Sequence, residues 1–157
     1  MNDFYQNLNQ QLEALTEGCT VLTSNLANSA ALLFEELEGV NWAGFYLLRD
    51  DTLLLGPFCG RPACLAIPLG KGVCGTAAKE GRVLLVPDVH KFPGHIACDS
   101  RSRSEIVLPL IRDGRLLGVL DIDSPAENRF SEEDREGLSR FAEIISSLSG
   151  WENYRIL

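Results

Sequence analysis

The sequence predicts an α+β fold in which a central antiparallel sheet of about six strands carries the N- and C-terminal helices on one face. Apolar residues recur at helical spacing over residues 1–38, and short aromatic and aliphatic runs replace that pattern from residue 41. A helical pattern returns after residue 130. We therefore expect one domain over residues 1–157, with a helical segment at 1–38, the sheet and site loops at 41–123, and a C-terminal helix at 131–150.

The first elements follow from spacing and breaks. Leu8 and Leu12 belong to a first helix, and a break near Gly18 separates it from a second helix that ends near residue 38. The apolar runs at 42–48 and 53–55 flank a polar turn, so they predict two strands of a hairpin.

The middle of the chain alternates short apolar runs with glycine-rich breaks. Residues 64–69 predict a strand, residues 72–79 a short helix that Gly81 closes, and residues 83–86 a buried strand. Residues 87–104 show no periodicity, and a loop of that length favours a binding role.

The last third of the chain carries the clearest local signals. Residues 105–111 and 116–123 are apolar runs on either side of an Asp113-Gly114 turn, which is typical of a β-hairpin. Ser131 precedes three acidic residues and an apolar helical pattern, so it is expected to cap the last helix.

Charge and composition exclude several classes of protein. The chain has 14 Lys and Arg residues against 22 Asp and Glu residues, and this formal charge of −8 opposes binding to nucleic acid. No apolar stretch approaches the roughly 20 residues of a membrane helix, and the N-terminus lacks a basic region followed by an apolar core. We therefore expect a soluble cytoplasmic protein.

The five cysteines are an odd number, and a reducing compartment would keep them free. Cys19 and Cys59 lie near a helix break and in a turn, where an incidental role is the simpler interpretation. Cys64, Cys74 and Cys98 each lie beside a turn or an irregular loop, which favours reactive chemistry.

The surroundings of Cys98 leave more than one interpretation open. Arg101 and Arg103 follow it closely in sequence, and these cations would stabilise a thiolate. His95 and Cys98 could also supply two ligands of a zinc site, although the cysteine spacing matches no zinc finger. His90 and His95 otherwise read as ordinary loop histidines.

Acidic residues converge at one end of the predicted sheet. Strand alternation places Asp121 and Asp123 on one face, and counting across the turn brings Glu105 close to Asp123. Trp42 and Tyr46 recur on one face of an earlier strand, as core packing or as the apolar wall of a site. The three acids are either solvated strand ends or part of a binding site.

The chain resembles the free methionine-(R)-sulfoxide reductases, which are single GAF domains. The C-terminal half of the GAF signature is carried by residues 104–110, 118–124 and 130–134. The more specific motifs are Asn41-Trp42-Ala43-Gly44-Phe45-Tyr46, Gly56-Pro57-Phe58, Pro62-Ala63-Cys64, Gly70-Lys71-Gly72-Val73-Cys74-Gly75 and Ala97-Cys98-Asp99-Ser100.

This resemblance implies reduction of the free amino acid by thiol chemistry, without a metal or an organic cofactor. It implies Cys98 as the nucleophile, Cys64 as the resolving cysteine and Cys74 as a second thiol that takes over the disulfide. The resulting disulfide would be reduced by thioredoxin, and a homodimer is left open. The order in which the three thiols act also stays open, because Cys74 is the alternative nucleophile.

The same resemblance assigns roles to the polar and aromatic residues. Glu105, Asp121 and Asp123 would hold the substrate ammonium, and one of them, kept protonated, would donate to the sulfoxide oxygen. Trp42 and Tyr46 would enclose the methyl group, and N–H groups of the loop at 94–104 would bind the substrate carboxylate.

Two other classes of function compete with this interpretation. The first is a GAF module that binds a small ligand, such as a cyclic nucleotide, without catalysis. The second is a redox or zinc sensor that uses Cys64, Cys74, His95 and Cys98.

Overall fold

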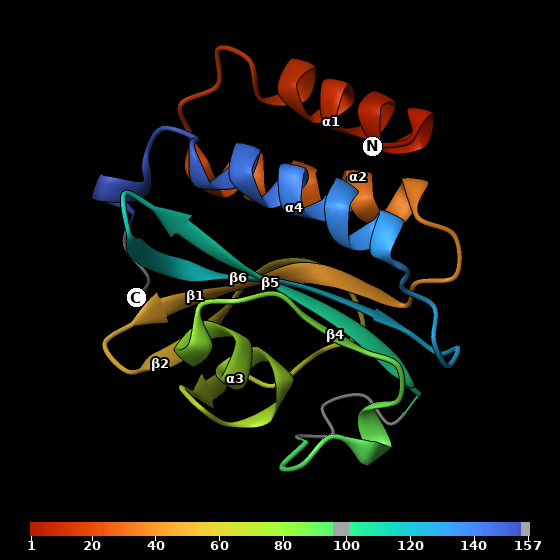
Figure 1. Cartoon of the computed structure of the whole chain (residues 1–157). Coiled ribbons are helices and arrows are strands. Elements are labelled where there is room, and N and C mark those ends of the chain that lie inside the picture. Colours follow the sequence, from red (N-terminus) through yellow and green to blue (C-terminus); the bar gives the residue numbers. More distant parts are fainter. Residues whose placement is uncertain (96–100, 155–157) are drawn as a thin grey trace.

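The computed structural model describes residues 1–95 and 101–154, and in it six strands form one antiparallel sheet in the order β3-β2-β1-β6-β5-β4. Figure 1 shows this sheet between a helical layer on one side and the short helix α3 on the other. The strands are β1 (Trp42–Arg49), β2 (Thr52–Gly60), β3 (Ala66–Pro68), β4 (Leu84–Val86), β5 (Ser104–Arg112) and β6 (Arg115–Ser124). The predicted fold class is confirmed.

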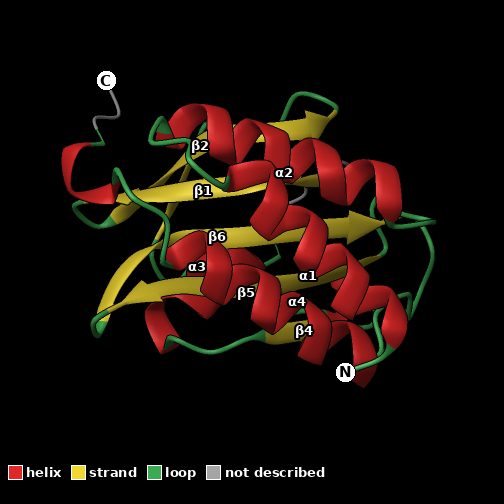
Figure 2. Cartoon of the chain, turned by 90° about the horizontal axis from the view of Figure 1, so that it is seen from above, coloured by secondary structure: helices red, strands yellow, loops and turns green. Residues whose placement is uncertain are grey.

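Three helices cover one face of the sheet, as Figure 2 shows from above. They are α1 (Asp3–Thr16), α2 (Leu22–Glu36) and α4 (Glu132–Ser146). The helices α2 and α4 pack directly on the strands, whereas α1 lies on their outer side as a third layer (Figure 1). Gly137 of α4 makes room for the Tyr5 ring of α1, since a Cβ atom there would lie 2.0 Å from that ring.

The two predicted hairpins are present, and each contains one shift in its register. Asp113 and Gly114 both have positive φ, +52° and +75°, as a two-residue turn between antiparallel strands requires. A register shift between Leu110 and Ile111 then moves the β5–β6 pairing by one residue and places Glu105 opposite Asp123. The Ser131 cap is also confirmed, because its side chain accepts from the Asp134 N–H within a capping box.

Two elements are shorter than the sequence predicts. The expected strand at 64–69 is reduced to β3, which pairs only with β2 and ends at Pro68, a residue that has no N–H to donate. Helix α4 ends at Ser146, and a separate 3₁₀ turn, η2 (Trp151–Asn153), follows. A second 3₁₀ turn, η1 (Val89–Lys91), lies in the long loop before β5.

Helix α3 (Gly72–Glu80) is the element that positions the site, because it covers the face of the sheet opposite the other helices (Figure 1). Gly81 ends it in the left-handed conformation, with φ +65°, as predicted. Within the described residues, no helix has the length and apolar character needed to cross a membrane.

Candidate active site

Three carboxyl side chains meet on the α3 face of the sheet. The register pairs Glu105 with Asp123 across β5 and β6, and Asp121 follows two residues before Asp123 on the same face. Glu105 and Asp121 are buried, with exposed fractions of 7% and 5%. The interpretation of these acids as solvated strand ends is therefore wrong for Glu105 and Asp121, because the segments around α3 cover them.

Aromatic side chains form the wall next to these acids. Trp42 and Tyr46, both on β1, stack with ring centroids 5.9 Å apart, and Phe58 of β2 also stacks on Trp42, at 5.2 Å. The Trp42 Nε1–H donates to the carbonyl of Arg61 at 3.1 Å, and the Tyr46 hydroxyl donates to the carbonyl of Cys64 at 2.9 Å. The wall is therefore fixed by hydrogen bonds as well as by stacking.

Helix α3, which covers this face of the sheet, places a thiol next to the acids. Cys74 lies in its first turn, is 4% exposed, and its Sγ–H donates to Glu105 Oε2 at 3.9 Å. The helix approaches closely because Gly75 has no side chain: a Cβ atom there would lie 2.5 Å from the Pro68 carbonyl oxygen. A larger residue at position 75 would push α3 and Cys74 away from the sheet.

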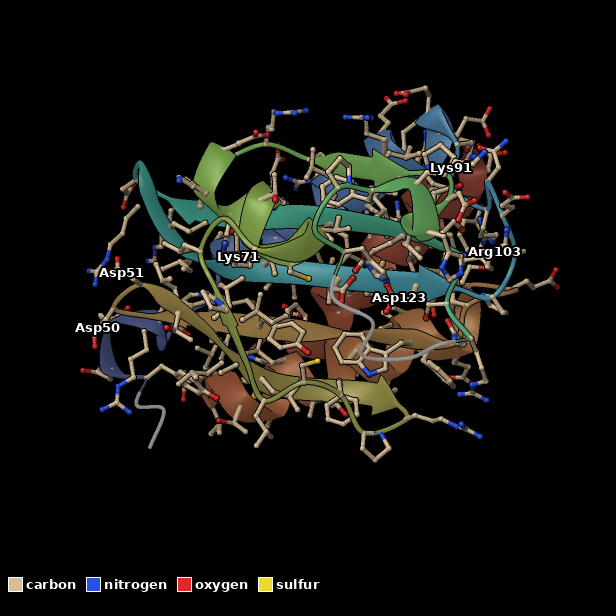
Figure 3. The ribbon with its side chains drawn as sticks, turned by 90° about the horizontal axis from the view of Figure 1, so that it is seen from below. Asp50, Asp51, Lys71, Lys91, Arg103 and Asp123 are labelled. Atoms are coloured by element: carbon tan, nitrogen blue, oxygen red, sulfur yellow. The ribbon has the colours of Figure 1, made fainter. Side chains whose placement is uncertain are left out.

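These groups surround a small cavity of about 50 Å³. The residues that line it come from β1, α3, the loops around it and the ends of β5 and β6. They are Trp42, Tyr46, Pro62, Ala63, Ile67, Lys71, Gly72, Val73, Cys74, Val89, His95, Ser102, Glu105, Asp121 and Asp123. Figure 3 views the α3 face of the sheet, from below relative to Figure 1, and labels Lys71 and Asp123 there.

Burial and mutual repulsion favour the protonated forms of the central groups. Burial, then the neighbouring Asp121 charge, raises the pKa of Glu105 well above its usual range. Burial, then the Asp123 charge, raises the pKa of Asp121 in the same direction. The Oδ1 atom of Asp121 accepts no hydrogen bond from the residues described in the structure, so a bound donor would gain a desolvated acceptor.

The thiol of Cys74 is held in the same environment. Burial, followed by the charges of Asp121 and Glu105, raises the pKa of Cys74. A thiolate is the reactive form of cysteine, so this position disfavours Cys74 as the first nucleophile. Burial also raises the pKa of Tyr46, which keeps its hydroxyl protonated and able to donate.

Cys74, Glu105 and Asp121 place a sulfur and two oxygens within 4.8 Å of one another. Such a set could hold a metal ion, but metal ligands must be deprotonated, and the raised pKa values of all three groups favour protons instead. These three side chains are therefore suited to donating or sharing protons.

The structure brings together most of the residues that the sequence singles out. Trp42, Tyr46, Cys74, Glu105, Asp121 and Asp123 line one cavity. Cys64 packs against the apolar cluster that contains Trp42, Tyr46 and Cys74, and it is disulfide-bonded. Cys19, Cys59 and Cys74 carry free thiols. Cys98, the predicted nucleophile, lies outside the described residues.

Some lining residues were not identified from the sequence as candidates. His95, which the sequence predicts as an ordinary loop histidine or as a zinc ligand, lines the cavity, and burial lowers its pKa. Lys71 and Ser102 come from separate loops with no pattern of their own, although Lys71 stands within the Gly70-Lys71-Gly72 motif. That motif is the feature of the sequence that points to Lys71.

The chain is similar to known proteins in sequence and in structure. The family model for the GAF domain matches residues 23–148. The free methionine-R-sulfoxide reductase of Escherichia coli is 50% identical over 153 residues, which cover 98% of this chain and 93% of that protein.

Two solved structures contain substrate. The free methionine-R-sulfoxide reductase from Neisseria meningitidis, in complex with its substrate, superimposes with a TM-score of 0.88 at 45% identity, covering 93% of this chain and 89% of that one. The fRMsr of Staphylococcus aureus, also in complex with substrate, gives a TM-score of 0.86 at 49% identity, with coverage of 90% and 93%. In sequence and in structure, this chain belongs to the free methionine-R-sulfoxide reductase family of GAF-domain proteins.

Proposed function

We propose that this chain reduces free L-methionine (R)-S-oxide to L-methionine, with cysteine thiols as the electron donor and thioredoxin as the final reductant. The observation that carries the proposal is the small cavity in which buried acids and a thiol face an aromatic wall. The relatives solved in complex with substrate support it.

The cavity suits a small zwitterion with a sulfoxide group. Carboxylates such as Asp123 bind the substrate ammonium, and the Trp42 and Tyr46 rings enclose its methyl group. Backbone N–H groups of the loop at 94–104 bind the carboxylate.

The proposed reaction begins with attack of the Cys98 thiolate on the sulfoxide sulfur. Glu105, whose raised pKa keeps a proton available, donates that proton to the sulfoxide oxygen. The hydroxyl then moves from the substrate sulfur to the Cys98 sulfur as the sulfur–sulfur bond between them breaks. Methionine leaves reduced by two electrons, and Cys98 is oxidised to a sulfenic acid. Cys64 then condenses with the sulfenic acid, which releases water and forms a disulfide.

The first test is turnover of the separate epimers of free methionine sulfoxide with dithiothreitol as reductant. We expect consumption of the R epimer and release of methionine, measured by chromatography. N-acetyl-methionine-sulfoxide amide is the matched control, because blocking both ends removes the charges that the site would recognise. Equal turnover of the blocked compound would contradict recognition of a free amino acid.

The cysteine variants separate the steps. Cys98→Ser should abolish even a single turnover, since a hydroxyl is a poor nucleophile here. Cys64→Ser should release about one methionine per enzyme without reductant and leave a sulfenic acid that dimedone labels. Cys74→Ser should be milder, and Cys19→Ser and Cys59→Ser nearly silent. A burst from Cys98→Ser, with none from Cys74→Ser, would make Cys74 the nucleophile.

A further inference from the structure

The most exposed large apolar side chain in the described part of the chain lies next to the disulfide-bonded cysteine. Leu65 is 77% exposed and directly follows Cys64. Three more exposed apolar residues flank it in the same segment, and with Leu65 they form what we call the Leu65 strip: Pro62, Leu65, Ala66 and Pro68. Single exposed apolar residues are common, but here they gather beside a bond that has to be reopened in every catalytic cycle.

The Leu65 strip is held in place from its inner side. The carbonyl of Leu65 accepts from the Leu55 N–H at 3.0 Å, and the Tyr46 hydroxyl donates to the Cys64 carbonyl at 2.9 Å. The segment leads into β3, which is an edge strand paired only with β2 among the described strands. The strip is therefore ordered without a partner, and its outer side offers an open strand edge.

The two ends of the strip differ in charge. Arg61 precedes the strip and Lys71 follows it, and both are exposed. Neither forms an ion pair with a residue in the described ranges 1–95 and 101–154. The exposed acids Asp50 and Asp51 lie beside the Lys71 end, because the Leu69 N–H donates to the Asp51 carbonyl at 3.0 Å. The local positive charge is therefore at the Arg61 end, and it complements an acidic group on the partner.

We propose that the Leu65 strip is the docking surface for the protein dithiol of the thioredoxin type that reduces the enzyme. This inference rests on the proposed function. The apolar strip packs against the partner around its active-site thiol, and Arg61 faces an acidic residue at the rim of the contact.

The docked partner would attack at Cys64. Its thiolate bonds to the Cys64 sulfur, the enzyme disulfide breaks, and the second enzyme sulfur leaves as a thiolate that takes up a proton. The second thiol of the partner then attacks the partner's first sulfur, which is bonded to Cys64, and releases the Cys64 thiol. Two electrons and two protons pass to the enzyme, and the partner ends as a disulfide.

The test compares two reductants in one variant. Leu65→Glu should raise the KM for reduced thioredoxin by about tenfold, because it places a charge in the apolar contact. Turnover with dithiothreitol should stay as in the unmodified chain, since a small dithiol needs no docking surface. Val21→Glu is the matched control, because Val21 is 57% exposed at the start of α2 and lies outside the strip.

The outcomes separate the docking surface from the proposed function. No turnover of the unmodified chain with either reductant would contradict the proposed function itself. Normal turnover with both reductants in Leu65→Glu, or an equal loss with both, would overturn the docking surface alone.

Trapping the complex gives an independent test. A thioredoxin whose second active-site cysteine is replaced by serine should form a stable mixed disulfide with Cys64, located by mass spectrometry of the digested adduct. An adduct on any other cysteine of the chain would overturn attack at Cys64.

Discussion

The two faces of the sheet are built from the same strands and both carry apolar clusters, but the α3 face also buries acidic side chains. On β6, Leu120 and Ile122 point toward the helical layer and are fully buried in its apolar core. Asp121 lies between them and points to the other face, where α3 covers it. Strand alternation thus lets neighbouring residues serve stability and chemistry separately.

The α3 face is the face of the sheet on which the protein tolerates buried acidic side chains. The helical face buries a continuous apolar cluster that includes Phe45, Ile106 and Phe141. The α3 face buries two acids and a thiol, which cost stability unless they are protonated or bound to a ligand. We therefore expect substitutions on the first face to change the free energy of unfolding, and substitutions on the second to change kcat/KM.

The largest expected effect is on the helical face. Ile122→Ala should lower the free energy of unfolding by about 2–5 kcal/mol, because it leaves a cavity in a fully buried core. At a temperature where the variant stays folded, kcat/KM should remain close to that of the unmodified chain, since both flanking aspartates stay in place. Urea denaturation and steady-state assays would measure the two quantities. A large loss of kcat/KM in the folded variant would show that the two faces are coupled.

The next effect is on the α3 face, one residue away. Asp121→Asn should reduce kcat/KM by about 10²-fold, which corresponds to about 2.7 kcal/mol of transition-state stabilisation. Its free energy of unfolding at neutral pH should not fall, because the amide removes a buried group whose ionisation burial opposes. Asp51→Asn, at the exposed β1–β2 turn, is the control. Activity equal to the unmodified chain in Asp121→Asn would assign Asp121 a merely structural role.

The local parts of this design are predictable from the sequence. Counting outward from the turn at Asp113 and Gly114 brings Glu105 within one residue of Asp123. The register shift between Leu110 and Ile111, which that counting does not include, makes Asp123 the partner of Glu105. The alternation on β6 likewise predicts which face the aspartates occupy. The capping box at Ser131 needs only residues within one turn of the helix.

The parts that depend on distant segments could not be predicted. The burial of Glu105 and Asp121 results from the segments around α3 folding over the sheet, and no local pattern at the acids reports it. The same holds for His95 and Ser102, which reach the cavity from a loop without periodicity. The outer position of α1 depends on Gly137 accepting the Tyr5 ring, a contact between residues at opposite ends of the chain.

The smallest expected effect is a pH dependence of the free energy of unfolding, which tests the contrast between the two faces. The folded chain holds the Glu105 proton to higher pH than the unfolded chain does, because burial and the Asp121 charge raise its pKa. As pH rises from about 4.3, the pKa of a free glutamate, toward the raised value, the unfolded chain loses that proton first and the folded state loses stability. Glu105→Gln removes this contribution.

The difference in free energy of unfolding, Glu105→Gln minus the unmodified chain, should therefore increase with pH above about 4.3 and level off beyond the raised pKa. Urea denaturation at a series of pH values measures it. Glu35→Gln, at an exposed position on α2, is the matched control and should give a much flatter difference. A difference for Glu105→Gln that is as flat as the control would mean that Glu105 ionises as readily in the folded chain as in water. The α3 face would then be a solvated surface like the turns around it, and the contrast between the two faces would not extend to their titration.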